Sequence, residues 1–221
     1  MIPFTIAEFL NVFERYNNAV WPGHVLIYLA GLTAIALAFK RGRVASELIS
    51  LILTALWLWM GVVYHLIFFS TINKAAPLFA ALFIFQALIF IFTGALNSRL
   101  SFGFRYDVQG ILGAVLITYA LIGYPITGMA FGHVYPAAPT FGVPCPTTIF
   151  TFGLLLSAGV NAGFYVLLIP MLWSLMGLWA AISLGMYEDL GLAVSGLSAA
   201  GTMLPVRAGF RKLTAYGFMR T

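Results

Sequence analysis

The side chains most able to do chemistry in this chain are three histidines and a single cysteine: His24, His65, His133 and Cys145. Neutral imidazoles and a thiolate together bind soft or borderline metal ions. Two histidines on separate helices can instead ligate a haem iron. As hydrogen-bonding groups, the same side chains can also hold a small solute. Each of these chemistries requires a fold that brings residues far apart in the sequence to one place.

Cys145 has the most unusual local sequence, because it lies between Pro144 and Pro146 and is followed by Thr147 and Thr148. Proline donates no N–H and disfavours helix in the residue before it, so we expect non-helical chain here, with carbonyls free to face a cavity. The threonines supply hydroxyls at the start of the next helix, an end that carries partial positive charge. A thiol in this position suits a soft metal or a reactive nucleophile. The alternative is an inert buried cysteine, which is what a lone cysteine most often is.

His65 is the most informative of the histidines, because it ends the apolar run LWLWMGVVYH. A titratable group inside a membrane helix usually faces the bundle interior or a cavity. Trp57, Gly61 and His65 are spaced four residues apart on one helical stripe, where Gly61 lets a neighbouring helix approach. The alternative is a neutral imidazole that only fixes helix packing. For His24, near the water interface, and His133, in a loop, structural or solvated roles are the simpler interpretation.

The composition excludes a water-exposed globule. The chain has 221 residues, of which 62% are hydrophobic and 8% charged, whereas soluble domains carry about 25% charged residues. One cysteine excludes an internal disulfide and any C-x-x-C motif. The net charge of +5 comes from short basic runs beside apolar segments, which indicates membrane topology and no nucleic-acid partner.

The elements that must position these residues are membrane helices. About 20 apolar residues cross a hydrocarbon core of ~30 Å, and such runs predict an all-α, seven-helix transmembrane bundle in one domain, residues 1–221. The predicted spans are about 21–39, 45–69, 77–96, 108–131, 140–159, 164–185 and 189–205. Residues 1–18 are too polar to span. Thr5 and Glu8 form a capping box there, and the apolar spacing predicts a short interfacial helix that packs on outer loops.

The fifth span is the irregular one. Residues 147–158 are too few to cross the membrane, so we expect part of 140–146 to enter as a proline-broken, non-helical segment. Such backbone is tolerated only where protein or water satisfies its hydrogen bonds. Pro125 also predicts a kink in the fourth span.

The positive charges predict the orientation. With seven spans and the N-terminus outside, nine Lys and Arg residues lie on the inner side and two, Arg15 and Lys74, on the outer side. The inner nine are Lys40, Arg41, Arg43, Arg99, Arg105, Arg207, Arg211, Lys212 and Arg220. With six spans, five Lys and Arg residues would lie on the inner side and six on the outer side. The positive-inside bias therefore favours seven spans with a cytoplasmic C-terminus.

This topology gathers the polar candidates on the outer side of the membrane. The candidate solute-binding residues are His24, His65, Asn73, His133, Cys145, Thr147 and Thr148, and the candidate metal ligands are His65, His133 and Cys145. Glu188 and Asp189 either cap the last span or draw cations to an outer vestibule. Gln86 lines a pore or bonds to another helix. The sharpest geometric prediction is that His65 and Cys145 lie at one outward-facing pocket.

Four motifs carry a resemblance to a known family: WPGH at 21–24, LWLWMGVVYH at 56–65, the FFSTIN that follows, and YPAAPTFGVPCPTTIFTFGLLL at 135–156. They resemble an uncharacterised bacterial family of small multi-pass membrane proteins, a domain of unknown function. The resemblance covers nearly the whole chain and implies a multi-pass protein of the bacterial inner membrane.

Three functions stay open at this point. The first is a small permease or channel component for an ion or small solute, with the metal version using His65, His133 and Cys145. The second is a membrane haem or redox protein with His24 and His65 as axial ligands. The third is a non-catalytic subunit or assembly partner, bound to another protein or to a second copy. Common ATPase, hydrolase and zincin motifs do not occur, and no lysine lies inside the last helix for a retinal Schiff base, so a catalytic role is disfavoured.

Overall fold

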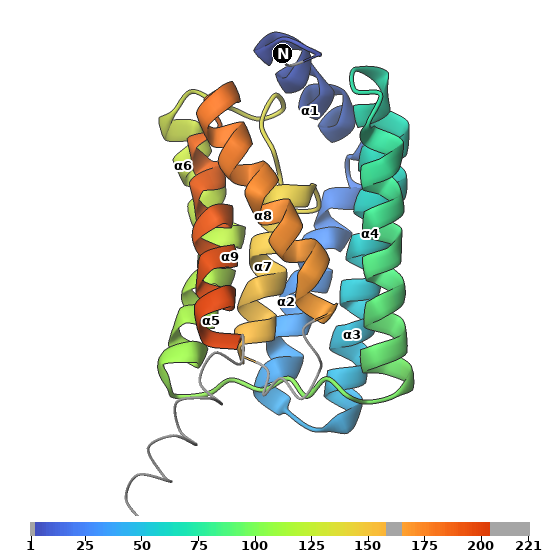
Figure 1. Cartoon of the computed structure of the whole chain (residues 1–221), viewed down its shortest axis with the longest axis vertical. Helices are drawn as coiled ribbons and strands as arrows, with labels where there is room; N and C mark the ends of the chain where they lie inside the picture. Colours follow the sequence, from blue (N-terminus) through green and yellow to red (C-terminus); the bar gives the residue numbers. More distant parts are fainter. Residues whose placement is uncertain (1–2, 158–164, 204–221) are drawn as a thin grey trace, which may run out of the picture.

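The computed structural model describes residues 3–157 and 165–203, and regular structure there is helical apart from an isolated bridge between Phe141 and Val143. Five helical segments are long and apolar enough to cross a membrane. They are α2 (Gly23–Lys40), α3 with η1 and η2 (Arg43–Thr71), α4 with η3 (Ala76–Leu96), α5 with η4 and α6 (Val108–Ala130), and α8 (Tyr165–Leu184) (Figure 1). The prediction of an all-α membrane protein is confirmed at this level.

The remaining helices are α1 (Ile6–Val20), α7 (Pro144–Ser157) and α9 (Leu190–Met203), the last preceded by η5 (Tyr187–Asp189). The long segments divide into α3 (Arg43–Trp59), η1 (Met60–Phe68), η2 (Phe69–Thr71), α4 (Ala76–Phe90), η3 (Ile91–Leu96), α5 (Val108–Thr118), η4 (Tyr119–Gly123) and α6 (Tyr124–Ala130). Of these, η1, η3 and η4 are wider π-helical turns. The irregular turn η4 precedes Pro125, which has no N–H to continue the α-helical ladder.

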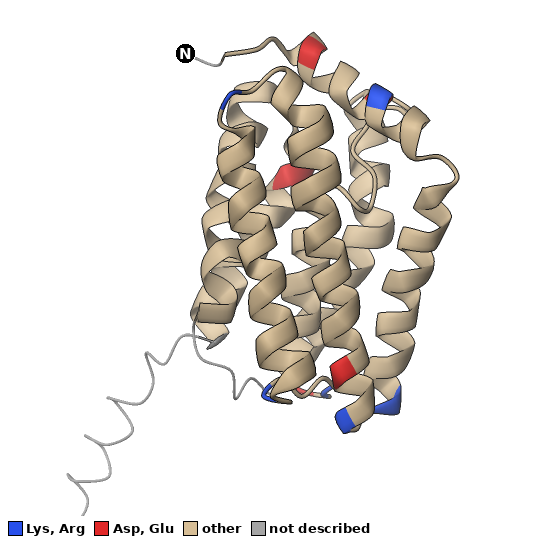
Figure 2. Cartoon of the chain, turned by 90° about the vertical axis from the view of Figure 1, so that its right-hand side faces the viewer, with Lys and Arg blue, Asp and Glu red and all other residues tan. Residues whose placement is uncertain are grey.

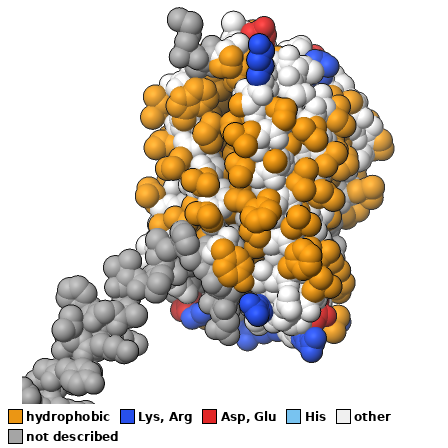
Figure 3. All heavy atoms as spheres, turned by 45° about the vertical axis from the view of Figure 1, so that its right-hand side comes forward, with side chains coloured by type: hydrophobic (Ala, Val, Ile, Leu, Met, Phe, Trp, Pro, Cys, Tyr) orange, Lys and Arg blue, Asp and Glu red, His pale blue; other side chains and the backbone are white. Residues whose placement is uncertain are grey.

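Apolar side chains cover the sides of the bundle and charged ones lie at its ends. Leu26 is 71% exposed and Ile182 is 75% exposed, and hydrophobic side chains cover the face seen in Figure 3 between charged groups at both ends. Loops at one end, here called the basic end, carry five Lys and Arg residues: Lys40, Arg41, Arg43, Arg99 and Arg105. Arg15 and Lys74 belong to the opposite end, where α1 lies (Figure 2). Such a surface suits a lipid bilayer.

Several predicted features lie outside the described residues. These are positions 158–159, 164 and 204–205 of the predicted spans, and the basic residues Arg207, Arg211, Lys212 and Arg220.

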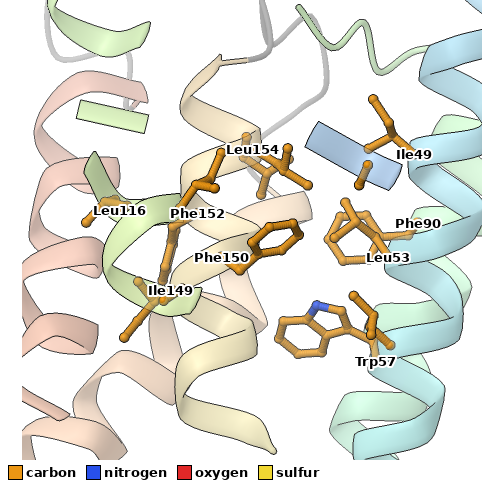
Figure 4. Close-up of a cluster of buried hydrophobic side chains, with 14 of the residues drawn as sticks. Ile49, Leu53, Trp57, Phe90, Leu116, Ile149, Phe150, Phe152 and Leu154 are labelled. Atoms are coloured by element: carbon orange, nitrogen blue, oxygen red, sulfur yellow. The ribbon is translucent and has the colours of Figure 1, made fainter. Parts of the chain in front are cut away.

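Helix α7 is the centre of the bundle. All of its 14 residues except Cys145 are buried, and it packs against α5, α8 and α9. Phe150 faces the side chains of Leu53 and Phe90 from α3 and α4 (Figure 4). The indole Nε1 of Trp57 donates a hydrogen bond of 3.1 Å to Thr151 Oγ1. A mostly apolar helix without charged side chains is expected when every face is covered by protein.

The chain before α7 enters the bundle without helical structure. Residues 141–143 are buried and non-helical, and Gly142 N donates to Thr147 Oγ1 at 2.9 Å. The prediction that the chain is broken at the prolines themselves is wrong, because α7 begins at Pro144 and includes Pro146. The first N–H groups of a helix have no partner within it, so proline in the first turn sacrifices no hydrogen bond.

Helix α1 lies across one end of the bundle and is held there by Asn17. The predicted capping box of Thr5 and Glu8 is confirmed, and α1 buries its apolar face. Asn17 is fully buried, and its Nδ2 donates to the carbonyls of Pro136 and Ala138 at 2.7 and 2.8 Å. Its Oδ1 accepts from Thr140 Oγ1 and His24 Nε2 at 2.9 and 3.0 Å. One side chain therefore joins α1, α2 and the chain that leads to α7.

Helices α5 and α7 touch through a pair of glycines. A Cβ at Gly153 would lie 2.7 Å from the carbonyl oxygen of Gly113, and one at Gly113 would lie 2.6 Å from that of Gly153. Gly61 plays a similar role between η1 and α4, as predicted, because its Cβ would lie 3.1 Å from Ala80 O. Small residues at such positions allow membrane helices to approach closely.

We expect Gly153→Ala to destabilise the protein, because the added methyl group would clash with backbone atoms of α5. The cost of such overpacking is about 1–3 kcal/mol, measured as a lower unfolding temperature in detergent. Gly201→Ala is the matched control, since no atom lies within 4 Å of a Cβ at Gly201 in α9. Equal unfolding temperatures for the two variants would contradict the close contact.

Asn17→Ala should free α1 from the rest of the bundle. It removes two donated and two accepted hydrogen bonds at a buried position, a loss of about 2–4 kcal/mol. We expect faster amide hydrogen exchange in α1 and a lower unfolding temperature. Asn18→Ala is the control, because Asn18 is the next residue of α1 and is exposed. If both variants exchange alike, Asn17 does not anchor the helix.

Candidate functional site

A cavity of about 290 Å³ lies under α1, close to the lower end of the range of roughly 300–1,000 Å³ for small-molecule sites. Its walls come from α1, η1, α8, η5 and the start of α7. The lining residues are Pro3, Phe4, Phe9, Phe13, Tyr64, His65, Phe69, Asn73, Ala75, Phe79, Tyr124, Pro139, Val143, Pro144, Cys145, Trp173, Met176, Trp179, Ala180, Leu184, Met186 and Asp189. The prediction that His65 and Cys145 lie at one pocket is confirmed.

His65 is buried in the cavity wall among aromatic rings. Its imidazole is fully buried and has ring centroids of five aromatic residues within 4.7–5.9 Å: Tyr64, Phe69, Phe79, Phe83 and Trp173. Neither ring nitrogen has a hydrogen-bond partner among the described residues. Buried polar atoms are normally paired, and leaving one unpaired costs about 1–3 kcal/mol. His65 is presented by the π-helical η1, a type of turn that is common at functional sites.

A polar group formed by α6, α7 and η5 lies at another part of the same wall. Tyr124 donates its hydroxyl hydrogen to Asp189 Oδ1 at 2.5 Å, and both residues are buried. The Cys145 thiol lies beside Asp189 and Trp173. The indole Nε1 of Trp173 has no hydrogen-bond partner among the described side and main chains. The cavity therefore presents a carboxyl group, an imidazole and an indole N–H within a mostly apolar lining.

Behind this group lies a second buried carboxylate, Glu188. His133 Nδ1 donates to Glu188 Oε1 at 2.8 Å, while the Tyr119 hydroxyl donates to the backbone carbonyl of Glu188 at 2.8 Å. The side chains of Glu188 and His133 are 0% and 10% exposed. The interpretation of His133 as a solvated loop residue is therefore wrong, because its ring is bonded to Glu188, which lies 55 residues further along the sequence.

The other predicted site residues divide into two groups. Asn73 lines the cavity together with His65 and Cys145, and its Oδ1 accepts from Ala75 N at 2.9 Å. His24 and Thr147 are buried and take part in the internal hydrogen bonds described above, with Asn17 and Gly142. Thr148 is also buried, away from the cavity lining. These last three residues, with His133, are not part of the cavity wall.

The positions of the histidines do not support the predicted metal site or the predicted haem site. Among the described residues, no group of three or more His, Cys, Asp and Glu side chains is arranged to hold a metal ion. His133 is bonded to Glu188, so it does not join His65 and Cys145. A chain of ring contacts through Tyr16 and Tyr64 links His24 to His65. His24 is bonded to Asn17 and does not line the cavity that His65 lines, so the two histidines do not share one pocket.

Asp189 and Trp173 line the cavity with polar groups but were not among the predicted site residues. Asp189 was noted only as a helix cap or a group that attracts cations, although an acidic pair in so apolar a chain was a usable signal. Trp173 had no signal, because one indole in an apolar helix resembles any other lipid-facing or packed aromatic residue. Of the two alternatives for Gln86, the bond to another helix is the one observed, with Nε2 donating to Val166 O at 3.0 Å.

Comparison with known proteins gives one match. A family model described as a family of unknown function, DUF6064, matches residues 6–212. No curated protein and no solved structure matches the chain. The match covers nearly the whole bundle and agrees with the resemblance seen in the motifs around Pro22, His65 and Cys145. The chain belongs to DUF6064, a family of unknown function whose member here is an all-helical protein with several segments able to span a membrane.

Proposed function

We propose that this protein is a small permease that binds an organic solute in the cavity under α1. The observation that carries the proposal is His65, a fully buried imidazole in the cavity wall whose two nitrogens have no partner among the described residues. A bound solute would supply that partner. Pockets that are mostly apolar and have a few convergent polar groups are the usual form of small-molecule sites.

The chain around the start of α7 supports transport over simple binding. Val143, Pro144 and Cys145 line the cavity at the point where non-helical backbone becomes helix. In many transporters, substrate sites are built from such discontinuous helices, because free backbone groups and helix ends can face the substrate. The buried centre of α7 argues against a continuous channel, since its side chains fill the middle of the bundle.

The proposed topology has seven spans, with the N-terminus outside and the C-terminus in the cytoplasm of a bacterial inner membrane. The short helices α7 and α9 would be the fifth and seventh spans, α7 being completed by the non-helical residues before it. Support comes from the described charges, with five basic residues at the basic end and two at the α1 end. The cavity would then open toward the outer side.

Filling the cavity should abolish solute binding. Ala180 on α8 lines the cavity, and we expect Ala180→Trp to occupy the space of the ligand. The measurement is untargeted mass spectrometry of small molecules that co-purify in mild detergent, followed by uptake of the enriched compound into proteoliposomes. We expect a loss of about tenfold or more in the bound compound, equivalent to at least about 1.4 kcal/mol.

Leu175→Trp is the matched control for this experiment. Leu175 lies on the same helix and is 64% exposed on its outer face, so a tryptophan there leaves the cavity unchanged. The control should retain the compound and its uptake. Equal retention by Ala180→Trp would contradict a solute site in this cavity.

The orientation can be tested with single cysteines in a Cys145→Ser background. Lys74 and Arg99 are exposed residues at opposite ends of the bundle. In intact bacterial cells, a membrane-impermeant maleimide should label Lys74→Cys and should label Arg99→Cys only after permeabilisation. Fusions after Thr221 test the seventh span. A fluorescent protein fused at this position should fluoresce, and alkaline phosphatase fused at the same position should be inactive. The reverse result would support six spans.

A further inference from the structure

Two buried acids lie next to each other at the α1 end, Glu188 and Asp189, and their partners differ. Glu188 is fully buried and Asp189 is 2% exposed. Among the described residues, Glu188 is paired with His133, whereas the side chains beside Asp189 are the neutral hydroxyl of Tyr124, which donates to it, and the Cys145 thiol. A carboxylate removed from water is costly unless a cation or several donors compensate for its charge. Asp189 lines the cavity, so a ligand there can supply the missing charge.

The walls of the cavity also favour a cation. Nine of the lining residues are Phe, Tyr or Trp. Asp189 is the one lining residue with a carboxyl group, and the other titratable side chains in the lining are His65, Cys145 and the tyrosines. The faces of aromatic rings attract cations, and the attraction is stronger where water is excluded. The lining includes no Lys or Arg that would repel such a ligand or neutralise Asp189 internally.

His65 is an independent indication of the ligand's chemistry. It is fully buried, lines the same cavity and has both nitrogens without a partner among the described residues. In a neutral imidazole one nitrogen is a hydrogen-bond acceptor, which suits a ligand that carries an N–H donor. An inorganic cation would need several oxygen ligands, and the aromatic walls do not provide them.

We propose that the solute is a small organic cation, a protonated monoamine with an apolar or aromatic body. Its ammonium group pairs with Asp189, and its body packs among the rings under α1. Because the lining has one carboxyl group, we assign a single positive charge to the ligand. The cavity volume of about 290 Å³ limits the apolar body of the ligand to about one ring. This assignment rests on the proposed function, since it identifies the solute of the same cavity.

Three probes that share a phenyl ring and a short chain test the assignment: phenethylamine, phenethyl alcohol and phenylacetate. They carry positive, zero and negative charge, and their binding to purified protein in detergent is measured by tryptophan fluorescence and by the unfolding temperature. We expect the amine to bind about tenfold or more tightly than the alcohol, since a charge-assisted hydrogen bond is roughly twice as strong as a neutral one. Phenylacetate should not bind.

Asp189→Asn should remove the preference for the amine and leave binding of the alcohol unchanged. Glu14→Gln is the control, because Glu14 is a carboxylate of α1 that does not line the cavity. The order of the three probes on the unmodified protein tests the proposal even if Asp189→Asn does not fold. Equal affinity for amine and alcohol, or no binding of the amine, overturns the cation assignment. The permease proposal fails separately, when Ala180→Trp retains its co-purifying compound.

Discussion

Backbone hydrogen bonding in a region without water is the constraint on which this structure depends. Every N–H and C=O at membrane depth needs a partner within the protein, yet residues 141–143 enter the bundle without helical structure. Thr147, in the first turn of α7, accepts from Gly142 N within this stretch, and Asn17 of α1 donates to the carbonyls of Pro136 and Ala138 just before it. The non-helical chain, the central helix and the surface helix therefore form one unit, and the cavity is the space that they enclose with η1 and α8.

The cavity contains polar groups that a purely structural interior would avoid. An unpaired imidazole and a carboxyl group bonded to a neutral hydroxyl both lower stability. Elsewhere in the bundle the buried polar side chains mostly have simple roles: Trp57 donates to Thr151, and Gln86 donates to a carbonyl of α8. Among the described residues, His65 and Trp173 of the cavity wall have buried nitrogens without a partner, and His24, Gln86, Thr148 and Glu188 each have one such atom outside the lining. His65 differs from these four because both of its polar atoms are unpaired and it lines a cavity that a ligand can enter.

The sequence was sufficient where structure depends on local spacing. Thr5 and Glu8 form their capping box, Gly61 admits a neighbouring helix, and the five longest apolar runs are helices. It was insufficient where structure depends on contacts between distant segments. The pairing of His133 with Glu188 joins a loop to η5, and no periodicity encodes it. The prolines around Cys145 were misassigned because proline is unfavourable inside a helix and harmless in its first turn, and only the fold fixes where that turn begins.

The anchoring of α1 by Asn17 has a consequence for biosynthesis. Its acceptors, the carbonyls of Pro136 and Ala138, lie 119 and 121 residues further along the chain. At about 5–20 residues per second, the ribosome needs on the order of ten seconds to make that length. During this interval α1 lacks these acceptors while the chain that contains α2 to α6 is made. Helix α1 therefore reaches its final contacts late, and the roof of the cavity closes late in assembly.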